Sequence, residues 1–413
     1  MSSGQYSSTP LPRHHLPLDR SRRWDPVGPL CMLFLAFLGI SAIHSAQIAT
    51  HGNQWRGQLV WFSVGTAFYL ICARIDYRFF LRQAHWIYFG SIFLLLCLWT
   101  PLGIRRYGAL RWIRIFGFQL QPAEIAKMAT MVMVSALLSG TRMGKMGESK
   151  WDLGKIFCIF FVPWLLIFLQ PDLGSALILP PILLALLYVS ELSGRFFLTV
   201  AWLGFFLLAI LAWDISRYRN FLVENDLRPD QHAGLYQTHS PLPLRDYQRN
   251  RILGFVAPEV VDPGGTGIGW NLRQSLIAVG SGGLLGKGSG EGEQAQLGYL
   301  PRSVATNDFL FSVLAEEKGV LGSMAALILL ITLASNNLHI AGLAHCRFGR
   351  HLAVAVAIFL AAHTAINVGM AIGFMPITGV PLPFLSHGGS FLIVCCILQG
   401  IVQSIYHRRQ NLH

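Results

Sequence analysis

Acidic side chains at the ends of apolar segments are the first candidates for chemistry in this sequence. Asp308 follows Thr306 and Asn307, where a glycine-rich stretch that starts at Asp262 gives way to an apolar segment. A carboxylate is costly inside a bilayer, so one at the mouth of a membrane helix is a functional candidate. Asp308 could act as a general base that removes a proton from a substrate. In the structural alternative, Asp308 only caps the helix or stabilises its first turn.

A second candidate group lies in GALRWIRIFGFQLQPAEIAK, residues 108–127. Pro122 suits the first turn of a helix, which places Glu124 and Lys127, three residues apart, on one face. The two could form a local ion pair that closes a buried polar gap. In the functional interpretation, Arg111 and Lys127 bind a phosphate, because the planar guanidinium can make two charge-assisted hydrogen bonds.

Three weaker signals accompany these groups. The turn QPDLGSA carries Asp172, and residues 373–390 contain three prolines within 376–383 together with paired glycines. Non-helical backbone at membrane depth is tolerated only where it lines a cavity or is buried in protein, so we predict a re-entrant loop there. The adjacent charges in 316–318 predict an inward-facing, ion-paired cluster.

The composition places these residues in a membrane protein. The chain of 413 residues is 53% hydrophobic and only 13% charged, about half the charged share of a soluble domain. Its net charge of +12 would suggest nucleic acid in a soluble protein. Here it favours anionic lipid or a phosphate-bearing substrate instead, and no nucleic acid. The seven cysteines match neither zinc nor disulfide spacing.

Ten apolar segments have roughly the length of a membrane-crossing helix. They are residues 27–47, 57–74, 84–102, 122–140, 154–170, 174–191, 195–213, 307–335, 352–373 and 388–406. We therefore predict an all-α polytopic membrane protein with about ten transmembrane helices and one large outer loop, about 214–306, between spans 7 and 8. Residues 1–25 are predicted to be a disordered cytoplasmic tail, and residues 26–410 a single transmembrane domain.

Basic residues in the short loops predict that both termini are cytoplasmic. The short outer loop 103–121 is an exception, because it holds Arg105, Arg106, Arg111 and Arg114. Either the topology differs locally or an anionic group binds there. The strong candidates then fall at the outer ends of different segments. This convergence predicts a polar cavity that opens to the outer leaflet, with acid–base carboxylates and phosphate-binding cations.

Five ordered motifs resemble the SEDS family of polytopic proteins, to which RodA and FtsW belong, over roughly residues 30–408. The motifs are GALRWI…QPAEIAK, QPDLGSA, YQRNRILGFVAPEVVDPGGTGIGWNLRQSLIAVGSGGLLGKG, QAQLGYLP…NDFLFSVLAEEKGVLG and NVGMAIGFMPITGVPLPFLSHGGS. The wording IAVGSGGLLGKG is closer to the elongation branch, RodA, than to the division branch. The segment LPRSVATNDF is longer than the family's usual LPERHTDF, and His387 replaces a common tyrosine.

The resemblance implies a peptidoglycan glycosyltransferase that uses lipid II at the outer face of the bacterial cytoplasmic membrane, for cell-wall elongation and cell shape. The family's catalytic aspartate corresponds to Asp308, its QP-x-E-x-x-K pair to Glu124 and Lys127, and its PDLG aspartate to Asp172. The implied partners are a class B penicillin-binding protein, which supplies transpeptidation, and other membrane proteins of the elongation complex.

The residues and the resemblance predict the same chemistry. Asp308 would deprotonate the acceptor sugar hydroxyl, and undecaprenyl pyrophosphate would leave with inversion at the donor carbon. Arg111 and Lys127, together with Lys287, would stabilise the leaving pyrophosphate, and Glu124 would orient Lys127. A divalent cation, Mg or Mn, could share that task, although no ligand cluster in the sequence demands one. The alternatives are a lipid II flippase, which needs polar groups along its whole path, and a non-catalytic scaffold for a transpeptidase.

Overall fold

The apolar segments predicted from the sequence are all helical in the computed structural model. It describes residues 24–49, 51–106, 109–115, 118–141, 150–170, 172–225, 227, 235–238, 240, 242, 244, 246–262, 264–265, 267 and 269–409. Most of the predicted tail therefore lies outside the described residues. Asp25, which we assigned to that tail, accepts hydrogen bonds from the Gly28 amide and the Asn336 side chain.

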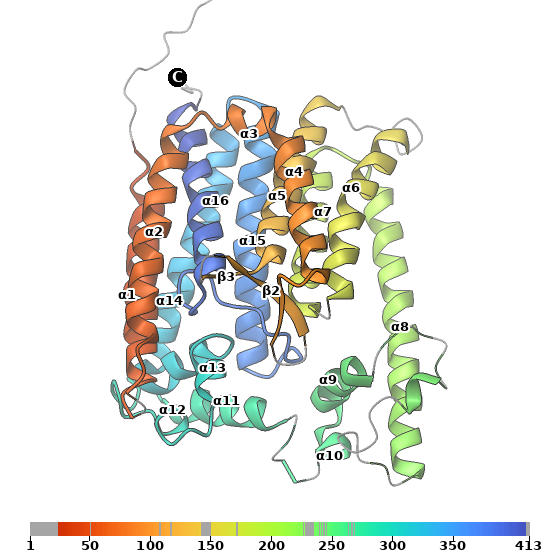
Figure 1. Cartoon of the computed structure of the whole chain (residues 1–413), viewed down its shortest axis with the longest axis vertical. Helices are drawn as coiled ribbons and strands as arrows, with labels where there is room; N and C mark the ends of the chain where they lie inside the picture. The colour runs from red at the N-terminus through yellow and green to blue at the C-terminus, as the bar shows by residue number, and fades with distance from the viewer. Residues whose placement is uncertain are drawn as a thin grey trace, which may run out of the picture.

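Long helices run side by side and form the body of the molecule (Figure 1). They are α1 (Val27–Ser45), α2 (Gln54–Arg74), α4 (Ala84–Leu96), α5 (Pro122–Gly140), α6 (Lys150–Leu169), α7 (Leu173–Val189), α8 (Gly194–Glu224), α14 (Leu310–Leu343), α15 (Arg347–Ala371) and α16 (Gly389–His407). Seven of them have the length and hydropathy to cross a membrane, and α7 and α4 with η1 (Cys97–Trp99) are shorter apolar helices. The predicted all-α polytopic class is confirmed, and the predicted count of ten spans stays a prediction.

Short elements gather at the ends of this bundle. The helix α3 (Arg78–Arg82) lies at one end, and α9 to α13 lie at the other (Figure 1). These are α9 (Asp246–Val256), α10 (Pro258–Val261), α11 (Trp270–Ser281), α12 (Glu293–Gln296) and α13 (Arg302–Ala305), with η2 (Tyr236–Thr238) before them. We call the end that carries α9 to α13 the site end, because the candidate residues gather there.

Two predicted loops contain regular structure. The described residues of 103–121, predicted to be a short outer loop, form the antiparallel sheet β1 (Gly103–Arg106), β2 (Ala109–Ile115) and β3 (Phe118–Leu120). The span predicted to end at 213 continues as α8 to Glu224, because its last turns bury Ile215 and Leu222 in a small separate core with α9 and α10. Within that core the buried Arg249 guanidinium bonds the Asp214 carboxylate at 2.8 Å, which joins α9 to α8.

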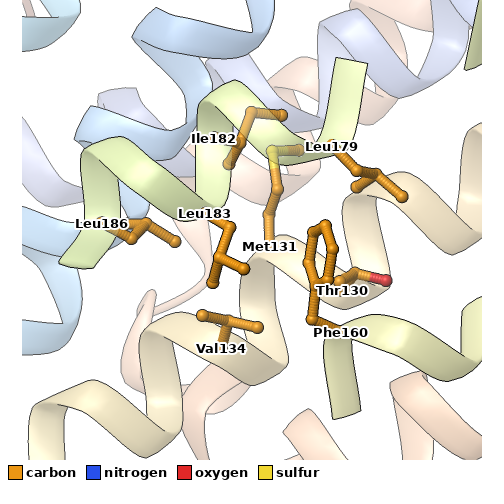
Figure 2. A pocket seen from close by; sticks show the side chains of 8 residues that line it. All are labelled: Thr130, Met131, Val134, Phe160, Leu179, Ile182, Leu183 and Leu186. Atoms are coloured by element: carbon orange, nitrogen blue, oxygen red, sulfur yellow. The ribbon is translucent and has the colours of Figure 1, made fainter. Parts of the chain in front are cut away.

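The bundle is closely packed where small residues meet. A Cβ atom on Gly400 of α16 would lie 2.5 Å from the Tyr69 carbonyl oxygen of α2, so the two backbones touch. Between α5, α6 and α7 lies an apolar cavity of about 10 Å³, about the volume that one water needs, lined by the residues drawn in Figure 2. Such packing gives the candidate residues a rigid frame.

Residues 372–388 connect α15 to α16 without a helix and enter the bundle, as the prolines predicted. The Leu385 backbone contacts α1 at Gly39, where a Cβ would lie 2.6 Å from the Leu385 carbonyl oxygen. The Pro381 carbonyl lies 3.2 Å from Nδ1 of His363, two turns inside α15. Val380, Leu382 and Leu385 are buried. We call residues 372–388 the re-entrant loop.

The long helix α14 is broken at Gly319, whose φ of 63° favours glycine. The break frees backbone groups that a continuous helix would pair. The carbonyls of Glu316 and Glu317 accept hydrogen bonds from the amides of Lys287 and Gly288, and the amide of Val320 donates to the Gly283 carbonyl. The glycine-rich segment before Lys287 therefore replaces the missing helical hydrogen bonds, and the close contacts at Gly286 exclude a side chain.

Candidate functional site

Asp308 lies at the site end, just before the first residue of α14, and three consecutive carbonyls hold its backbone. The Thr306 carbonyl accepts from the His387 amide at 2.9 Å, and the Asn307 carbonyl accepts from the Ser386 hydroxyl at 2.6 Å. The Asp308 carbonyl accepts from the Asn367 side-chain amide at 2.8 Å. The re-entrant loop and α15 thus fix the position of the carboxylate.

Asp308 is half-buried, and its carboxyl loses much of its hydration. Gly379, which has a φ of +75°, lies against it, and a Cβ there would be 3.4 Å from Oδ2. Burial raises the pKa of Asp308 to about 6, while Arg251 and Arg111 oppose this rise and Asp172 adds to it. A carboxyl with this pKa is mostly ionised at neutral pH and basic enough to accept a proton.

One side of the site consists of Arg111 on β2 and Asp172 at the start of α7. Asp172 caps α7, because its carboxylate accepts from the Ser175 amide and hydroxyl. The same carboxylate lies 3.7 Å from Nη1 of Arg111 and accepts from the Gln121 side chain at 3.1 Å. Asp172 therefore directs the guanidinium of Arg111, and both residues act on the charge of Asp308.

Glu124 and Lys127 pair inside α5 as predicted, with 2.9 Å between Nζ and Oε1, and both side chains are buried. The Lys127 ammonium also lies 3.3 Å from Nε2 of His363 and over the rings of Phe359 and Phe391. A lysine can only donate, so His363 accepts through Nε2 and its Nδ1 proton faces the Pro381 carbonyl. A direct contact of Lys127 with phosphate stays a prediction.

Lys287 belongs to a different cluster, beside the break in α14. Its ammonium lies 2.9 Å from the buried Glu316 carboxylate and 3.7 Å from Glu293. The hydrogen bond to Glu316 raises the pKa of Lys287. The Glu317 carboxylate accepts from the Gly290 amide at 3.3 Å. Glu316 and Glu317 face inward as predicted, but the predicted pairing within 316–318 is wrong, because Glu316 pairs with Lys287 and the Lys318 ammonium bonds the Ser289 hydroxyl. Lys287 makes its ion pairs with Glu316 and Glu293, so its role in binding pyrophosphate stays a prediction.

The donor set at the site does not fit a resident metal ion. Among the described residues, no group of three or more His, Cys, Asp or Glu side chains could hold one. The two acids that influence each other, Asp308 and Asp172, share their surroundings with the cations Arg111 and Arg251.

Three residues of the site were missed in the sequence analysis: Arg251, His363 and Asn367. Arg251 lies on α9 at the site end, and only the tertiary fold brings its charge to Asp308. His363 and Asn367 stand four residues apart on one face of α15, within its predominantly apolar second half. Polar side chains inside a membrane span are a signal of function, and this signal could have identified His363 and Asn367 from the sequence.

We expect the rate of the reaction at this site to fall on the acid side of about pH 6. Asp308 must be ionised to accept a proton. Below its pKa of about 6, each further pH unit should therefore lower the rate about tenfold. In Arg251→Ala the opposing positive charge is gone, so the acid limb of the pH–rate profile should move to higher pH. An acid limb at the same pH in that variant would show that the titrating group is not Asp308.

Asn367→Ala is expected to lower kcat about 10- to 100-fold with little change in KM, since a small misplacement of a catalytic group has effects of that size. The Asn367 amide holds the carbonyls of Asp308 and Val380 together at 2.8 and 2.7 Å. Asn337→Ala on α14 is the matched control, because Asn337 is also buried but has no side-chain hydrogen-bond partner among the described residues. Equal losses in the two variants would indicate a general packing defect instead.

The fold and this acid-lined end define a polytopic membrane protein with one half-buried carboxylate between cations. The model of the FtsW, RodA and SpoVE cell cycle proteins matches residues 27–411. The chain is 34% identical over 390 residues to the peptidoglycan glycosyltransferase MrdB of Escherichia coli K12, covering 94% of this chain and 95% of that protein. It is 31% identical over 402 residues to the probable peptidoglycan glycosyltransferase FtsW of Geobacter sulfurreducens, covering 94% and 96%.

Solved structures show the same fold. A chain from a peptidoglycan synthase complex superposes with a TM-score of 0.72 at 24% identity, covering 94% of this chain and 99% of that one. The rod shape determining protein RodA of Thermus thermophilus superposes with a TM-score of 0.64 at 23% identity, covering 94% and 97%. The chain belongs to the FtsW/RodA/SpoVE family, as its motifs predicted.

Proposed function

We propose that this chain is a peptidoglycan glycosyltransferase that polymerises lipid II for cell-wall elongation and cell shape. The observation that carries the proposal is Asp308, a half-buried carboxylate whose pKa is raised to about 6, within the electrostatic reach of Arg111 and Arg251. Relatives that match nearly the whole chain are named peptidoglycan glycosyltransferases, which supports the same activity.

The proposed reaction uses Asp308 as the general base. Its carboxylate takes the proton from the 4-hydroxyl of the acceptor N-acetylglucosamine as that oxygen attacks the anomeric carbon of the donor sugar. The bond from that carbon to the pyrophosphate breaks with inversion, and undecaprenyl pyrophosphate leaves. The rigid backbone around Asp308 supports this role, because a positioned base contributes only when its geometry is held.

Positive charge at the site would stabilise the leaving pyrophosphate. Arg111 is directed by Asp172, and Arg251 acts on Asp308 from α9, so two guanidinium groups surround the place where negative charge develops. Lys127 would contribute from inside α5, where Glu124 fixes its ammonium. A requirement for Mg or Mn stays a prediction, and polymerisation in the presence of EDTA tests it.

We place the site at the outer face of the bacterial cytoplasmic membrane, with both termini inside. The end of the bundle opposite the site carries α3 with Arg78 and Arg82, and Arg408 pairs there with Asp76. Basic residues concentrate on the cytoplasmic side of membrane proteins, which supports this orientation.

The proposed partner is a class B penicillin-binding protein that cross-links the glycan, together with other membrane proteins of the elongation complex. A similar fold occurs in a peptidoglycan synthase complex that coordinates polymerization and crosslinking. Co-purification of the two full-length proteins from membranes tests the pairing.

The activity is tested with purified full-length protein and labelled lipid II, with and without the cognate penicillin-binding protein. Glycan chains that lengthen with time are the expected product. The decisive contrary result is the absence of glycan under every condition together with transport of lipid II across liposome membranes. That result would make the protein a flippase and would assign the Lys287–Glu316 cluster a role beyond packing.

A further inference from the structure

Residues 274–286 comprise the last two turns of α11 and the glycine-rich chain that follows it, and their polarity is opposite to that of a surface segment. The side chains of Gln274 and Ser275 are buried, while Leu276 and Ile277 are exposed. The Ser275 hydroxyl bonds the Ser312 hydroxyl at 2.6 Å and the Ala371 carbonyl at 2.7 Å, so the polar face points into the protein. A water-exposed helix would show the reverse pattern.

The segment continues with two leucines that no described part of the protein covers. Leu284 is 71% exposed and Leu285 is 78% exposed, and the thirteen residues from 274 to 286 include no charged side chain. Exposed apolar patches of this kind mark contact with a partner or with a membrane.

The leucines join the exposed apolar face of a candidate membrane span, α14. α14 is long and apolar enough to cross a membrane, and beyond Gly319 it exposes one row of apolar side chains: Val320, Leu321, Met324, Ile328 and Ile331. The Val320 and Leu321 amides donate to the carbonyls of Gly283 and Leu284 at 2.9 and 3.2 Å. Leu284 and Leu285 therefore continue the apolar row past the break.

Before the break α14 has no such row, because its residues from Leu310 to Glu317 are all buried. The segment 274–286 covers them, and Gly282 lies directly on the Ala315 backbone, where a Cβ would be 2.0 Å from the carbonyl oxygen. The outer surface of the segment thus replaces the outer surface that α14 would itself have presented.

The backbone of the segment also meets the condition for lipid contact. Irregular chain survives at membrane depth only when its polar groups are paired within the protein. The Gly283 and Leu284 carbonyls accept from α14, and the Gly286 amide donates to the Gly282 carbonyl at 2.9 Å. Polar groups border the segment on both sides. Before it, the Trp270 indole donates to the Tyr299 carbonyl, and after it Lys287 pairs with Glu316.

We propose that residues 274–286 are embedded in the lipid bilayer as a re-entrant segment that wraps the first part of α14, instead of forming part of a water-exposed loop. The partner of this surface is the hydrocarbon near the membrane interface. The proposal does not depend on the catalytic one, because it concerns where the chain meets lipid.

The test measures depth with a nitroxide spin label on purified full-length protein in lipid nanodiscs. Single cysteines are introduced as Leu285→Cys and Ile277→Cys in a background with Cys158→Ser, because Cys158 is an exposed cysteine. Ile331→Cys on the lipid-facing row and Glu291→Cys on an exposed polar residue are the matched controls. Signal from the parent without an added cysteine is subtracted.

Labels at 285 and 277 are expected to collide with oxygen readily and with a water-soluble nickel chelate rarely, as the label at 331 does. The ratio of the two collision rates should shift away from the value at 291. Labels at 285 and 277 that collide with the nickel chelate as often as the label at 291 would overturn the proposal, and would leave the exposed leucines as a surface for a protein partner.

Discussion

Replacing Asp308 with asparagine is expected to reduce lipid II polymerisation by about 100- to 10,000-fold, the range that a positioned general base contributes. Asparagine keeps the size and shape of the side chain, so the three backbone carbonyls of residues 306–308 should keep their hydrogen bonds. Only the ability to accept a proton is lost. The measurement is the rate of glycan formation from labelled lipid II at saturating substrate.

The same variant should remain fully folded. Burial raises the pKa of Asp308 to about 6, so the stability that the protonated acid contributes is present at low pH and is lost as pH rises through 6. At neutral pH the buried carboxylate is therefore a cost, which asparagine removes. We expect the Tm of Asp308→Asn at neutral pH to equal or exceed that of the wild type. Full polymerisation by this stable variant would exclude Asp308 from the chemistry and leave Glu124 and Asp172 as the acids to examine.

Removing one member of the Glu124–Lys127 pair should cause the largest loss of stability. Both side chains are buried, so Lys127→Met leaves the Glu124 carboxylate unpaired, at a cost of about 3–5 kcal/mol in the free energy of unfolding. Glu124→Gln leaves the buried Lys127 ammonium without its carboxylate partner and should lower the free energy of unfolding by a similar amount. The double variant should lose much less than the sum, because no unpaired charge remains. Unfolding in detergent of all four proteins gives the coupling.

The matched control for this cycle is Lys155→Met on α6. Lys155 and Asp152 also stand three residues apart, at 3.3 Å, but both side chains are exposed, so about 0–1 kcal/mol is expected. The double variant also separates two roles of Lys127. If it is stable and polymerises lipid II at the wild-type rate, the pair only closes a buried polar gap. If it is stable but inactive, Lys127 contributes to the binding of pyrophosphate.

The parts of this protein that the sequence predicts are those governed by local patterns. Runs of apolar residues mark the helices, Pro122 marks the start of α5, and the prolines of 376–383 mark the re-entrant loop. Asp308 stands out because an acid beside an apolar span is rare for energetic reasons. The spacing of Glu124 and Lys127 is enough to predict their contact.

Other parts depend on contacts between residues far apart in the chain, which local patterns do not encode. The strands β1, β2 and β3 form a sheet against the bundle, although β1 and β2 carry arginines that the sequence analysis assigned to a loop. Arg251 acts on the charge of Asp308 from α9, a helix that the Arg249–Asp214 ion pair joins to α8. The break at Gly319 could not be predicted from local sequence, because the hydrogen bonds that replace those of the helix come from a glycine-rich segment distant in the chain.

The re-entrant loop also sets the order in which the protein becomes functional during its synthesis. Asp308 emerges from the ribosome before Asn367, Gly379 and Ser386, the residues that hold or border it. A chain whose synthesis stops after α14 can thus place Asp308 in the membrane without fixing its carboxylate. Shortened chains that lack α15 and α16 are therefore expected to be inactive, because they lack Asn367 and Ser386.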